Sequence, residues 1–228
     1  KVLLAFSGGL DTSFCAMYLA KDKGYEVHTA IANTGGFSPE ELKRIEERAY
    51  RLGAKTHATL DVTQEYYDKS IKYMVFGNVL RNGTYPISVS SERIFQAIAT
   101  IEYAKKIEAD YIAHGSTGAG NDQVRFDLTF DVLAGHIKVL TPTRDMVLTR
   151  EYGINYLKEH GYEADFTKME YSINAGLWGT SIGGKETLKS EQTLPESAYT
   201  KQVVKKEEET ITIDFEKGEI VGVNNVHY

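Results

Sequence analysis

The stretch KVLLAFSGGLDTSF, residues 1–14, decides the fold of this chain. Its apolar run, residues 2–6, is typical of a buried strand. The pair Gly8 and Gly9 then breaks the run, and the polar residues beyond it predict a helix that begins near Thr12. A strand that turns directly into a helix is the repeating unit of an α/β sheet.

The same corner offers groups that bind phosphate. Free backbone N–H groups at a helix start, and the close approach that glycines permit, suit an oxyanion such as pyrophosphate. The hydroxyls of Ser7, Thr12 and Ser13 are further donors. Asp11 is predicted either to cap the helix or to help hold magnesium on the phosphates. Taken alone, a tight turn with a capped helix and nothing bound is an equally good interpretation.

Two common nucleotide-binding loops and one catalytic turn are excluded. No lysine follows the glycines, as a Walker loop requires, and Gly8-Gly9-Leu10 does not continue as the dinucleotide motif G-x-G-x-x-G. Ala5 stands where the nucleophile elbow G-x-S-x-G needs its first glycine. Phosphate binding without a phosphate-gripping lysine suits pyrophosphate as a leaving group.

The composition is that of an ordinary globular chain of 228 residues, of which 42% are hydrophobic and 25% charged. This length suits one large domain, or one domain and part of another. The single cysteine, Cys15, excludes an intramolecular disulfide and a cysteine-rich site, so we expect a cytoplasmic protein with no protein-bound structural metal. No apolar run is long enough for a membrane span and no leader is visible, so we expect no membrane partner. A net charge of −6 with scattered basic residues argues against a nucleic-acid partner.

Short apolar runs alternate with helical patterns over the first 165 residues. A capping box from Ser38 to Glu41, with Pro39 at the first helical position, predicts a helix that ends at Gly53. Other helices are expected after Ser91 and before Gly161. Such alternation predicts an α/β fold with a doubly wound, mainly parallel sheet covered by helices on both faces. The expected strands are residues 2–6, 27–32, 56–60, 111–114 and 138–140.

The pattern changes near residue 165. We therefore expect a nucleotide-binding domain over residues 1–165 and the beginning of a second, α+β domain, which the chain leaves incomplete, over residues 166–228. The stretch YSINAGLWGTSIGGKE, residues 171–186, is predicted to be an irregular, ligand-facing loop. Residues 210–223 alternate around a glycine and predict a β-hairpin.

A second polar corner follows the fourth expected strand. The stretch AHGSTGAGNDQVRFDL, residues 113–128, packs small residues beside polar ones. Because the carboxyl ends of parallel strands meet at one edge of a sheet, this corner and the first are expected to share a site. A capped loop without a ligand is the less favoured interpretation, and His114 is given no proton-transfer role. The polar members of the corner are Thr117, Asn121, Asp122, Gln123 and Arg125.

These motifs resemble those of a known family. AFSGGLDTS, residues 5–13, is similar to the pyrophosphate loop of the N-type ATP pyrophosphatases, and HGSTGAGNDQVRF, residues 114–126, resembles the argininosuccinate synthases specifically. TYPISVSSER, TPTRD and YSINAGLWGTS occur in the order and at the spacing of that family, so the resemblance covers nearly the whole chain. It implies an adenine nucleotide α-hydrolase-like fold for residues 1–165 and the start of a citrulline- and aspartate-binding synthetase domain for residues 166–228.

The resemblance also implies a reaction. In this family the ureido oxygen of citrulline attacks the α-phosphorus of MgATP and releases pyrophosphate. The amine of aspartate then displaces AMP from citrullyl-AMP and forms argininosuccinate. ATP with Mg²⁺ is thus expected as a substrate, and the protein is expected to form a homo-oligomer, a tetramer. Positioning and electrostatic stabilisation serve such chemistry, and no covalent protein nucleophile is needed.

Matching the motifs residue by residue implies roles within this chain. Arg125 suits an amino-acid carboxylate, which its planar fork binds through two hydrogen bonds, and Asp122 suits an ammonium group. With Asp11, these two are the predicted catalytic residues. The predicted ATP contacts are Ala5, Phe6, Ser7, Gly8, Gly9, Leu10, Asp11, Thr12, Ser13, Ala32 and Gly115. The predicted citrulline contacts are Tyr85, Ser90, Asn121, Arg125, Ser172 and Ser181, and the predicted aspartate contacts are Thr117, Asn121 and Asp122.

Several positions depart from the family pattern and indicate a divergent branch. The turn after the second strand reads Asn33-Thr34-Gly35-Gly36 in place of a motif that ends in glutamine. The substituted positions elsewhere are Ala119 for a lysine, Thr143 for a tryptophan, and Asn174, Gly176 and Gly183 for acidic or amide residues.

Two other functions stay open on the sequence. One is another pyrophosphatase-type enzyme, such as a tRNA-thiolating one, which would need a second reactive cysteine and a basic surface. The other is a non-catalytic nucleotide- or amino-acid-binding fragment, an interpretation supported by the end of the chain at Tyr228, short of the length of the family members.

Overall fold

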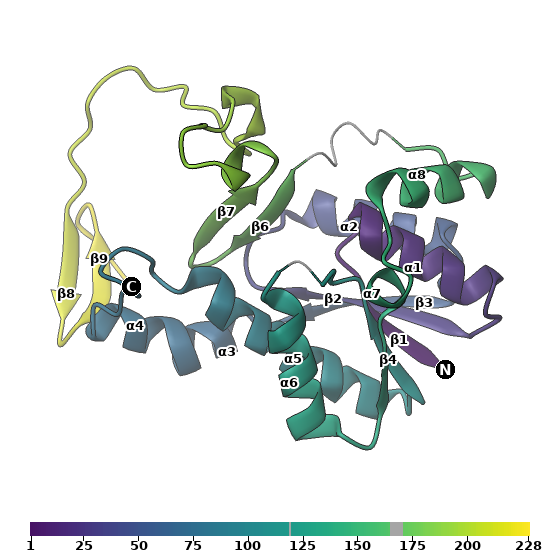
Figure 1. Ribbon diagram of the computed structural model, residues 1–228. Helices are drawn as coiled ribbons and strands as arrows, with labels where there is room; N and C mark the ends of the chain where they lie inside the picture. Colours follow the sequence, from purple (N-terminus) through teal and green to yellow (C-terminus); the bar gives the residue numbers. More distant parts are fainter. Residues whose placement is uncertain (119, 165–170) are drawn as a thin grey trace.

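Five parallel strands form the central sheet, in the order β3-β2-β1-β4-β5 (Figure 1). The computed structural model describes residues 1–118, 120–164 and 171–228. The predicted parallel sheet is confirmed, and the predicted strand ends agree within about one residue, the usual uncertainty of such boundaries. The strands are β1 (Val2–Ala5), β2 (Val27–Asn33), β3 (Thr56–Asp61), β4 (Tyr111–His114) and β5 (Lys138–Leu140).

Helices cover both faces of the sheet, which confirms the doubly wound class (Figure 1). A hydrophobic core lies on each face of the sheet, and alternate side chains of β1 point into one or the other. Val2 and Leu4 lie in the first core, and Leu3 lies in the second. The helices over the first core are α1 (Leu10–Lys21), α2 (Pro39–Arg51) and α8 (Arg150–Glu159). Those over the second are α5 (Ser88–Lys106) and α6 (Asp122–Ala134).

The predicted capping box is confirmed at the start of α2. The hydroxyl of Ser38 accepts from the backbone N–H of Glu41 at 3.2 Å, and the carboxylate of Glu41 accepts from the backbone N–H of Ser38 at 2.8 Å. Gly53, at a φ of +100°, follows the end of this helix, and Gly161, at +78°, follows α8. Both ends therefore lie where the glycines predict.

The start of α1 differs from the prediction. The helix begins at Leu10 with Gly9 as its N-cap, because the left-handed conformation of Gly8, at a φ of +75°, turns the chain early. Asp11 and Ser13 consequently lie inside the first turn. The predicted side-chain cap at this helix start is therefore wrong.

The start of α5 also lies earlier than predicted, at Ser88 rather than after Ser91. Ile87, at a φ of +59°, forms the N-cap. A β-branched residue in this region is uncommon, since its side chain crowds the backbone. The phenol of Tyr85, which accepts hydrogen bonds from the first turn of the helix, holds it there.

The prediction of an irregular loop over residues 171–186 is wrong. β6 (Ser172–Gly176) and β7 (Gly179–Gly183) form an antiparallel hairpin, in which Gly179 adopts a φ of +130°. The small and polar residues of this stretch carry no alternation of hydrophobicity, so the strand pattern was hidden. The other short elements before this hairpin are α3 (Thr63–Tyr66), the π-helical turn η1 (Tyr67–Ile71), α4 (Lys72–Phe76) and α7 (Pro142–Asp145).

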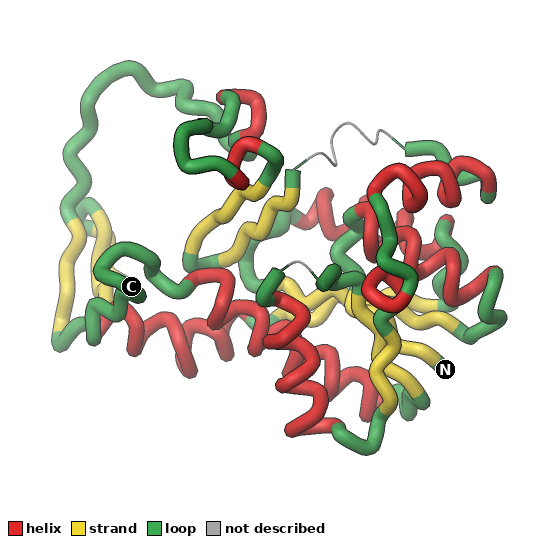
Figure 2. Tube along the Cα trace, viewed as in Figure 1, coloured by secondary structure: helices red, strands yellow, loops and turns green. Residues whose placement is uncertain are grey.

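The predicted hairpin within residues 210–223 is confirmed. β8 (Ile213–Glu216) and β9 (Glu219–Val223) pair around Gly218, and β10 (Val226–His227) adds a third strand. The chain between β7 and β8 is mainly loop (Figure 2), with short turns η3 (Glu186–Leu188) and η4 (Glu196–Ala198). The expected domain boundary at residue 165 falls on residues 165–170, which lie outside the described residues. Within the described chain, no helix has both the length and the apolar character needed to cross a membrane.

Candidate functional site

The glycine pair after β1 is held in place by α2. A Cβ on Gly8 would lie 3.2 Å from Cγ1 of Ile45, and the φ of +75° favours glycine in any case. Arg48, also on α2, donates from Nη1 to the carbonyl oxygen of Gly8. The path of this loop is therefore fixed by packing as well as by its own conformation.

The first turn of α1 presents backbone N–H groups. Gly9 supplies no side chain, and no described side chain caps this helix start. The hydroxyl of Ser7 accepts from the backbone N–H of Gly9 at 3.3 Å and shares a hydrogen bond with the hydroxyl of Thr12 at 3.2 Å. Backbone N–H groups and hydroxyls together are the donors that an oxyanion needs at a helix N-terminus.

The predicted ATP contacts differ in how far their side chains are buried. The side chains of Phe6 and Leu10 are buried in the core, so only their backbone atoms can face a nucleotide. Ser13 is also buried, and its hydroxyl has no hydrogen-bond partner among the described residues. Ser7 is exposed and Thr12 is half-buried, so theirs are the accessible hydroxyls.

Asp11 lies half-buried in the first turn of α1. Burial raises the pKa of its carboxyl, while the positive charge of Arg150 opposes that rise. No group of three or more His, Cys, Asp or Glu side chains in the described ranges is arranged to hold a metal ion. A role of Asp11 toward magnesium on a nucleotide stays a prediction.

The second polar corner lies directly against the first. β1 pairs with β2 on one side and with β4 on the other, so the strand order changes direction at β1. At the end of β4, a Cβ on Gly115 would lie 3.1 Å from the backbone nitrogen of Thr12. The two loops, far apart in the sequence, therefore meet at the point where open α/β sheets bind their ligands. Ala32, near the carboxyl end of β2, lies along the same edge of the sheet.

Four of the predicted amino-acid contacts form one hydrogen-bonded network. Arg125 donates from Nη1 to Oδ1 of Asp122 at 2.7 Å and from Nη2 to Oγ of Ser90 at 3.4 Å. That same hydroxyl shares a hydrogen bond with the phenol of Tyr85 at 3.3 Å. Residues from α5, α6 and the segment before α5 are thereby brought together.

The phenol of Tyr85 caps the start of α5. Its oxygen accepts from the backbone N–H groups of Val89 at 3.1 Å and Ser90 at 3.4 Å. Burial raises the pKa of this phenol, but the hydrogen bonds that it receives outweigh burial and hold the pKa of Tyr85 below its ordinary value. These bonds explain why α5 begins at Ser88, before the predicted start.

The remaining predicted contacts surround this network without joining it. Thr117, in the loop after β4, and Asn121, the N-cap of α6, are exposed. Ser172 is exposed and Ser181 half-buried on the β6–β7 hairpin. Within the part of the chain that the structure describes, no side-chain hydrogen bond links these two serines to Tyr85 or its partners. Their roles stay predictions.

Two charged residues of the site were missed in the sequence. Arg93 donates from Nε to Oδ2 of Asp122 at 3.1 Å and from Nη2 to Oδ1 of Asn174. Glu92 is 3% exposed, and its Oε1 accepts from the hydroxyl of Thr34 at 2.6 Å. The only available signal was their place in the motif TYPISVSSER, since every partner outside α5 is distant in sequence.

His114 is a packed core residue. Its Nε2 lies 2.9 Å from Oδ1 of Asp127, and its ring stacks on Phe126. Burial lowers the pKa of His114, although the Asp127 carboxylate opposes that effect. Arg144 donates to the other carboxylate oxygen of Asp127 at 2.5 Å. This chain of contacts braces the end of β4 against α6.

Three of the departures from the family pattern have a structural explanation. A Cβ on Gly36 would lie 1.9 Å from the carbonyl oxygen of Ala175, so only glycine fits beneath the hairpin. A Cβ on Gly176 would lie 3.1 Å from Cδ of Glu92. Thr143 is buried and donates from its hydroxyl to the carbonyl oxygen of Ser116 at 3.3 Å. The departure at Ala119 lies outside the described residues.

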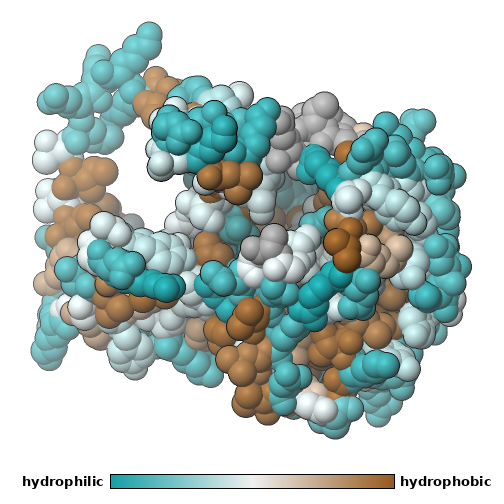
Figure 3. Space-filling model, viewed as in Figure 1, coloured by the Kyte–Doolittle hydropathy of each residue, from teal (hydrophilic) through white to brown (hydrophobic). Residues whose placement is uncertain are grey.

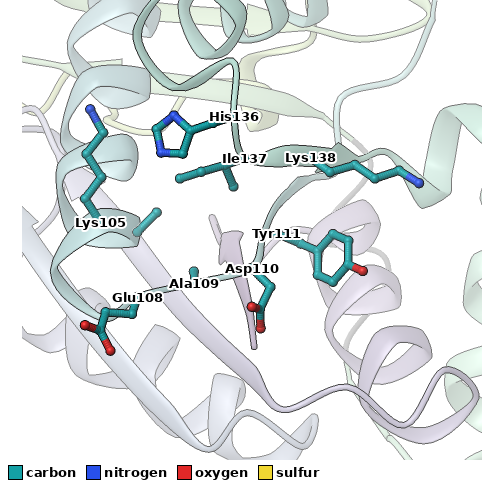
Figure 4. Close-up of a pocket in the computed structure, with 9 residues that line it drawn as sticks. Lys105, Glu108, Ala109, Asp110, Tyr111, His136, Ile137 and Lys138 are labelled. Atoms are coloured by element: carbon teal, nitrogen blue, oxygen red, sulfur yellow. The ribbon is translucent and has the colours of Figure 1, made fainter.

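A hollow of about 560 Å³ lies away from these loops, at the amino ends of β4 and β5. Figure 4 shows Asp110 and Tyr111 lining it at the start of β4, and His136 and Lys138 lining it at the start of β5. The carboxylate of Asp110 already pairs with the amino group of Lys1 at 2.5 Å. Because ligands of such sheets bind at the carboxyl ends of the strands, we assign this hollow no role.

Comparison with known proteins gives one consistent result. Residues 1–163 match the model of the arginosuccinate synthase N-terminal HUP domain. The chain is 40% identical to argininosuccinate synthase of Methanocaldococcus jannaschii, covering 97% of this chain and 56% of that protein. It is 39% identical to the Sulfurisphaera tokodaii enzyme, covering 99% and 57%, and 37% identical to that of Xanthomonas campestris pv. campestris, covering 98% and 57%. The chain thus spans a little over half the length of these curated relatives.

Proposed function

Because the chain belongs to the argininosuccinate synthase family, we propose that it is the nucleotide-binding part, and the first portion of the substrate-binding part, of an ATP-dependent ligase. The ligase condenses citrulline with aspartate. Citrulline attacks the α-phosphorus of MgATP, pyrophosphate leaves, and aspartate displaces AMP from citrullyl-AMP. Argininosuccinate, a precursor in arginine biosynthesis, is the product.

The observation that carries the proposal is the contact between the two polar corners. Gly115 packs against the backbone of Thr12, so a phosphate on the first turn of α1 lies beside the loop that leads to Asp122. Activation and condensation need the nucleotide and both amino acids in one place. The meeting of these loops supplies such a place without a protein nucleophile.

The residues divide the work between them in this proposal. The backbone from Ser7 to Ser13 holds the triphosphate, and the oriented N–H groups of α1 stabilise the charge that develops on pyrophosphate. Arg125 binds the carboxylate of citrulline. Asp122, which two arginines hold in place, receives the ammonium of aspartate.

A thiol-dependent reaction is disfavoured by the state of Cys15. The side chain is fully buried, and burial raises the pKa of its thiol, so the reactive thiolate is suppressed. A tRNA-thiolating enzyme would need an accessible thiolate. The ligase therefore remains the better-supported function.

We also propose that the protein is a cytoplasmic homotetramer, as the family resemblance implies. One surface suits contact between copies: Val124, Leu128 and Val132 on the outer face of α6 are 58%, 60% and 71% exposed. The patch that they form is visible as a hydrophobic area over α6 (Figure 3). Light scattering of the purified protein tests the assembly, and a monomer at micromolar concentration would contradict it.

The test of the function is a pyrophosphate assay. The protein is mixed with MgATP and citrulline, with and without aspartate, and pyrophosphate and argininosuccinate are followed. We expect pyrophosphate only when citrulline is present, and argininosuccinate only when aspartate is added. Pyrophosphate release that ignores citrulline would refute the ligase, and tight binding of MgATP without any turnover would favour a binding fragment instead.

A further inference from the structure

The β6–β7 hairpin is seated closely on the turn after β2. Gly35 and Gly176 form an isolated antiparallel bridge, and the backbone N–H of Leu177 donates to the carbonyl oxygen of Thr34 at 2.7 Å. The space between hairpin and turn is too small for any side chain on Gly36. A hairpin this close to its support has one register, because a shift of even one residue would bring side chains into the contact.

Glu92 lies directly beneath this contact. Its carboxylate accepts hydrogen bonds from the hydroxyl of Thr34 at 2.6 Å and from Nε2 of Gln96 at 2.9 Å. The Cδ atom would be 3.1 Å from a Cβ on Gly176. Burial raises the pKa of this carboxyl, while Thr34 and the nearby Arg93 oppose the rise. A buried acid with three such neighbours is a specific support, since an apolar residue there would leave the Thr34 hydroxyl without an acceptor.

Arg93 links the hairpin to the opposite side of the site. Its side chain is largely buried, with 12% exposed, and its guanidinium donates hydrogen bonds to residues on three elements. Nε donates to Asp122 on α6 at 3.1 Å, Nη1 to Gln96 on α5 at 2.7 Å, and Nη2 to Asn174 on β6. Only a planar fork reaches three acceptors in fixed directions, which a lysine cannot do.

We propose that Glu92 and Arg93 are positioning residues that set the β6–β7 hairpin, with Ser172 and Ser181 on it, relative to Asp122. Glu92 sets the distance between the hairpin and the turn after β2, and Arg93 sets the position of β6 relative to α6. The substrates assigned to those residues rest on the proposed function. The seating of the hairpin does not.

The chain contains a single tryptophan that reports on this seating. Trp178 lies at the tip of the hairpin, where its Nε1 donates to the carbonyl oxygen of Pro86 at 2.7 Å. Release of the hairpin breaks this bond and exposes more of the half-buried ring to water. Its emission maximum and its quenching by acrylamide therefore follow the seating in the intact chain, with or without turnover.

The experiment compares variants of α5 with one variant of the hairpin. We expect Glu92→Ala and Asn174→Ala to shift the Trp178 emission to longer wavelength and to raise the quenching constant about twofold, because each removes a contact that seats the hairpin. Glu92→Gln retains a carbonyl acceptor for Thr34 and is expected to restore the wild-type spectrum. Glu102→Gln, on the exposed face of the same helix, is the matched control and should change neither value.

A second readout separates positioning from general damage. In the ligase assay, Arg93→Lys and Asn174→Ala should raise the KM for citrulline and aspartate about tenfold and leave the KM for MgATP unchanged. Wild-type fluorescence in folded Glu92→Ala and Asn174→Ala proteins would overturn the inference, as would an equal rise in all three KM values. Should Glu92→Ala fail to fold, Asn174→Ala decides, since its side chain lies outside both cores. If the variants lose the seating of the hairpin but the wild-type protein releases no citrulline-dependent pyrophosphate, the proposed function is refuted and the positioning role is not.

Discussion

The loop after β1 and the β6–β7 hairpin both border the candidate site, but different forces hold them. The loop after β1 follows directly from a buried strand, and α2 and β4 pack against its backbone. The hairpin lies beyond residues 165–170 and depends on contacts with side chains such as Glu92 and Arg93. In the proposed function, the fixed backbone of the loop holds a phosphate, and the side chains that place the hairpin bring it toward the amino-acid substrates.

The largest effect is expected at Gly8, where the comparison predicts a loss of nucleotide binding. Gly8→Ala adds a Cβ 3.2 Å from Ile45 at a φ of +75°, so the loop must move. We expect MgATP affinity to fall at least about tenfold and stability to fall by about 2 kcal/mol. Gly24→Ala is the matched control, because Gly24 has a φ of +66° and open space around its Cβ position. Calorimetric titration measures the MgATP affinity, and denaturant unfolding measures the stability. Equal MgATP affinity in Gly8→Ala and Gly24→Ala would contradict a loop shaped for the nucleotide.

The second effect concerns Asp122, on the amino-acid side of the comparison. Asp122→Ala removes the carboxylate that Arg93 and Arg125 share, and leaves both guanidinium groups without it. The KM for aspartate should rise about tenfold or more while the KM for MgATP changes less than about twofold. Steady-state kinetics with each substrate varied in turn provide the measurement. Equal changes in the two constants would argue against the assigned role of Asp122.

A smaller and more local effect is expected at Gly36. In Gly36→Ala the new Cβ would meet the carbonyl oxygen of Ala175 at 1.9 Å, so the hairpin has to lift from the β2 turn. The Trp178 emission should move to longer wavelength while MgATP affinity stays unchanged. Gly183→Ala, on the same hairpin, is the control, since its Cβ would be 3.9 Å from the nearest atom. A parallel loss of MgATP binding in Gly36→Ala would show that the two regions are not independent.

The smallest effect is a pH dependence at His114, which braces the nucleotide side. Burial holds its pKa below the ordinary value of about 6.5, so the unfolded chain binds a proton more readily than the folded one. The stability that neutral His114 contributes is therefore full above about pH 6.5 and is lost as the pH falls toward the folded pKa. Burial also lowers the pKa of His57, but His57 is present in both wild type and His114→Gln, so the difference between their unfolding curves from pH 5 to 8 isolates His114. A difference that does not change with pH would contradict the prediction.

Features marked by residues close together in the chain could be predicted from the sequence, and contacts between distant side chains could not. The capping box at Ser38 and Glu41 depends on neighbours within a few residues, and the five strands are marked by their own apolar runs, so both were confirmed. That the two polar corners lie close together was predictable from the rule that parallel strands end at one edge of a sheet, whereas the contact of Gly115 with Thr12 was not predicted. Arg93 was missed because its acceptors on α6 and β6 are 29 and 81 residues away. The hairpin was missed because Gly, Ser and Asn carry no hydrophobic alternation.

The central claim is that two loops far apart in sequence form one nucleotide site, which the hairpin does not share. Gly115→Ala tests it most directly, because the new Cβ would press on the backbone of Thr12 and not on the β1 loop glycines. Calorimetric titration of MgATP into Gly115→Ala and Gly36→Ala, with circular dichroism to establish folding, is the measurement. We predict weakened binding in Gly115→Ala and wild-type binding in Gly36→Ala. Wild-type affinity in a folded Gly115→Ala protein would contradict the claim.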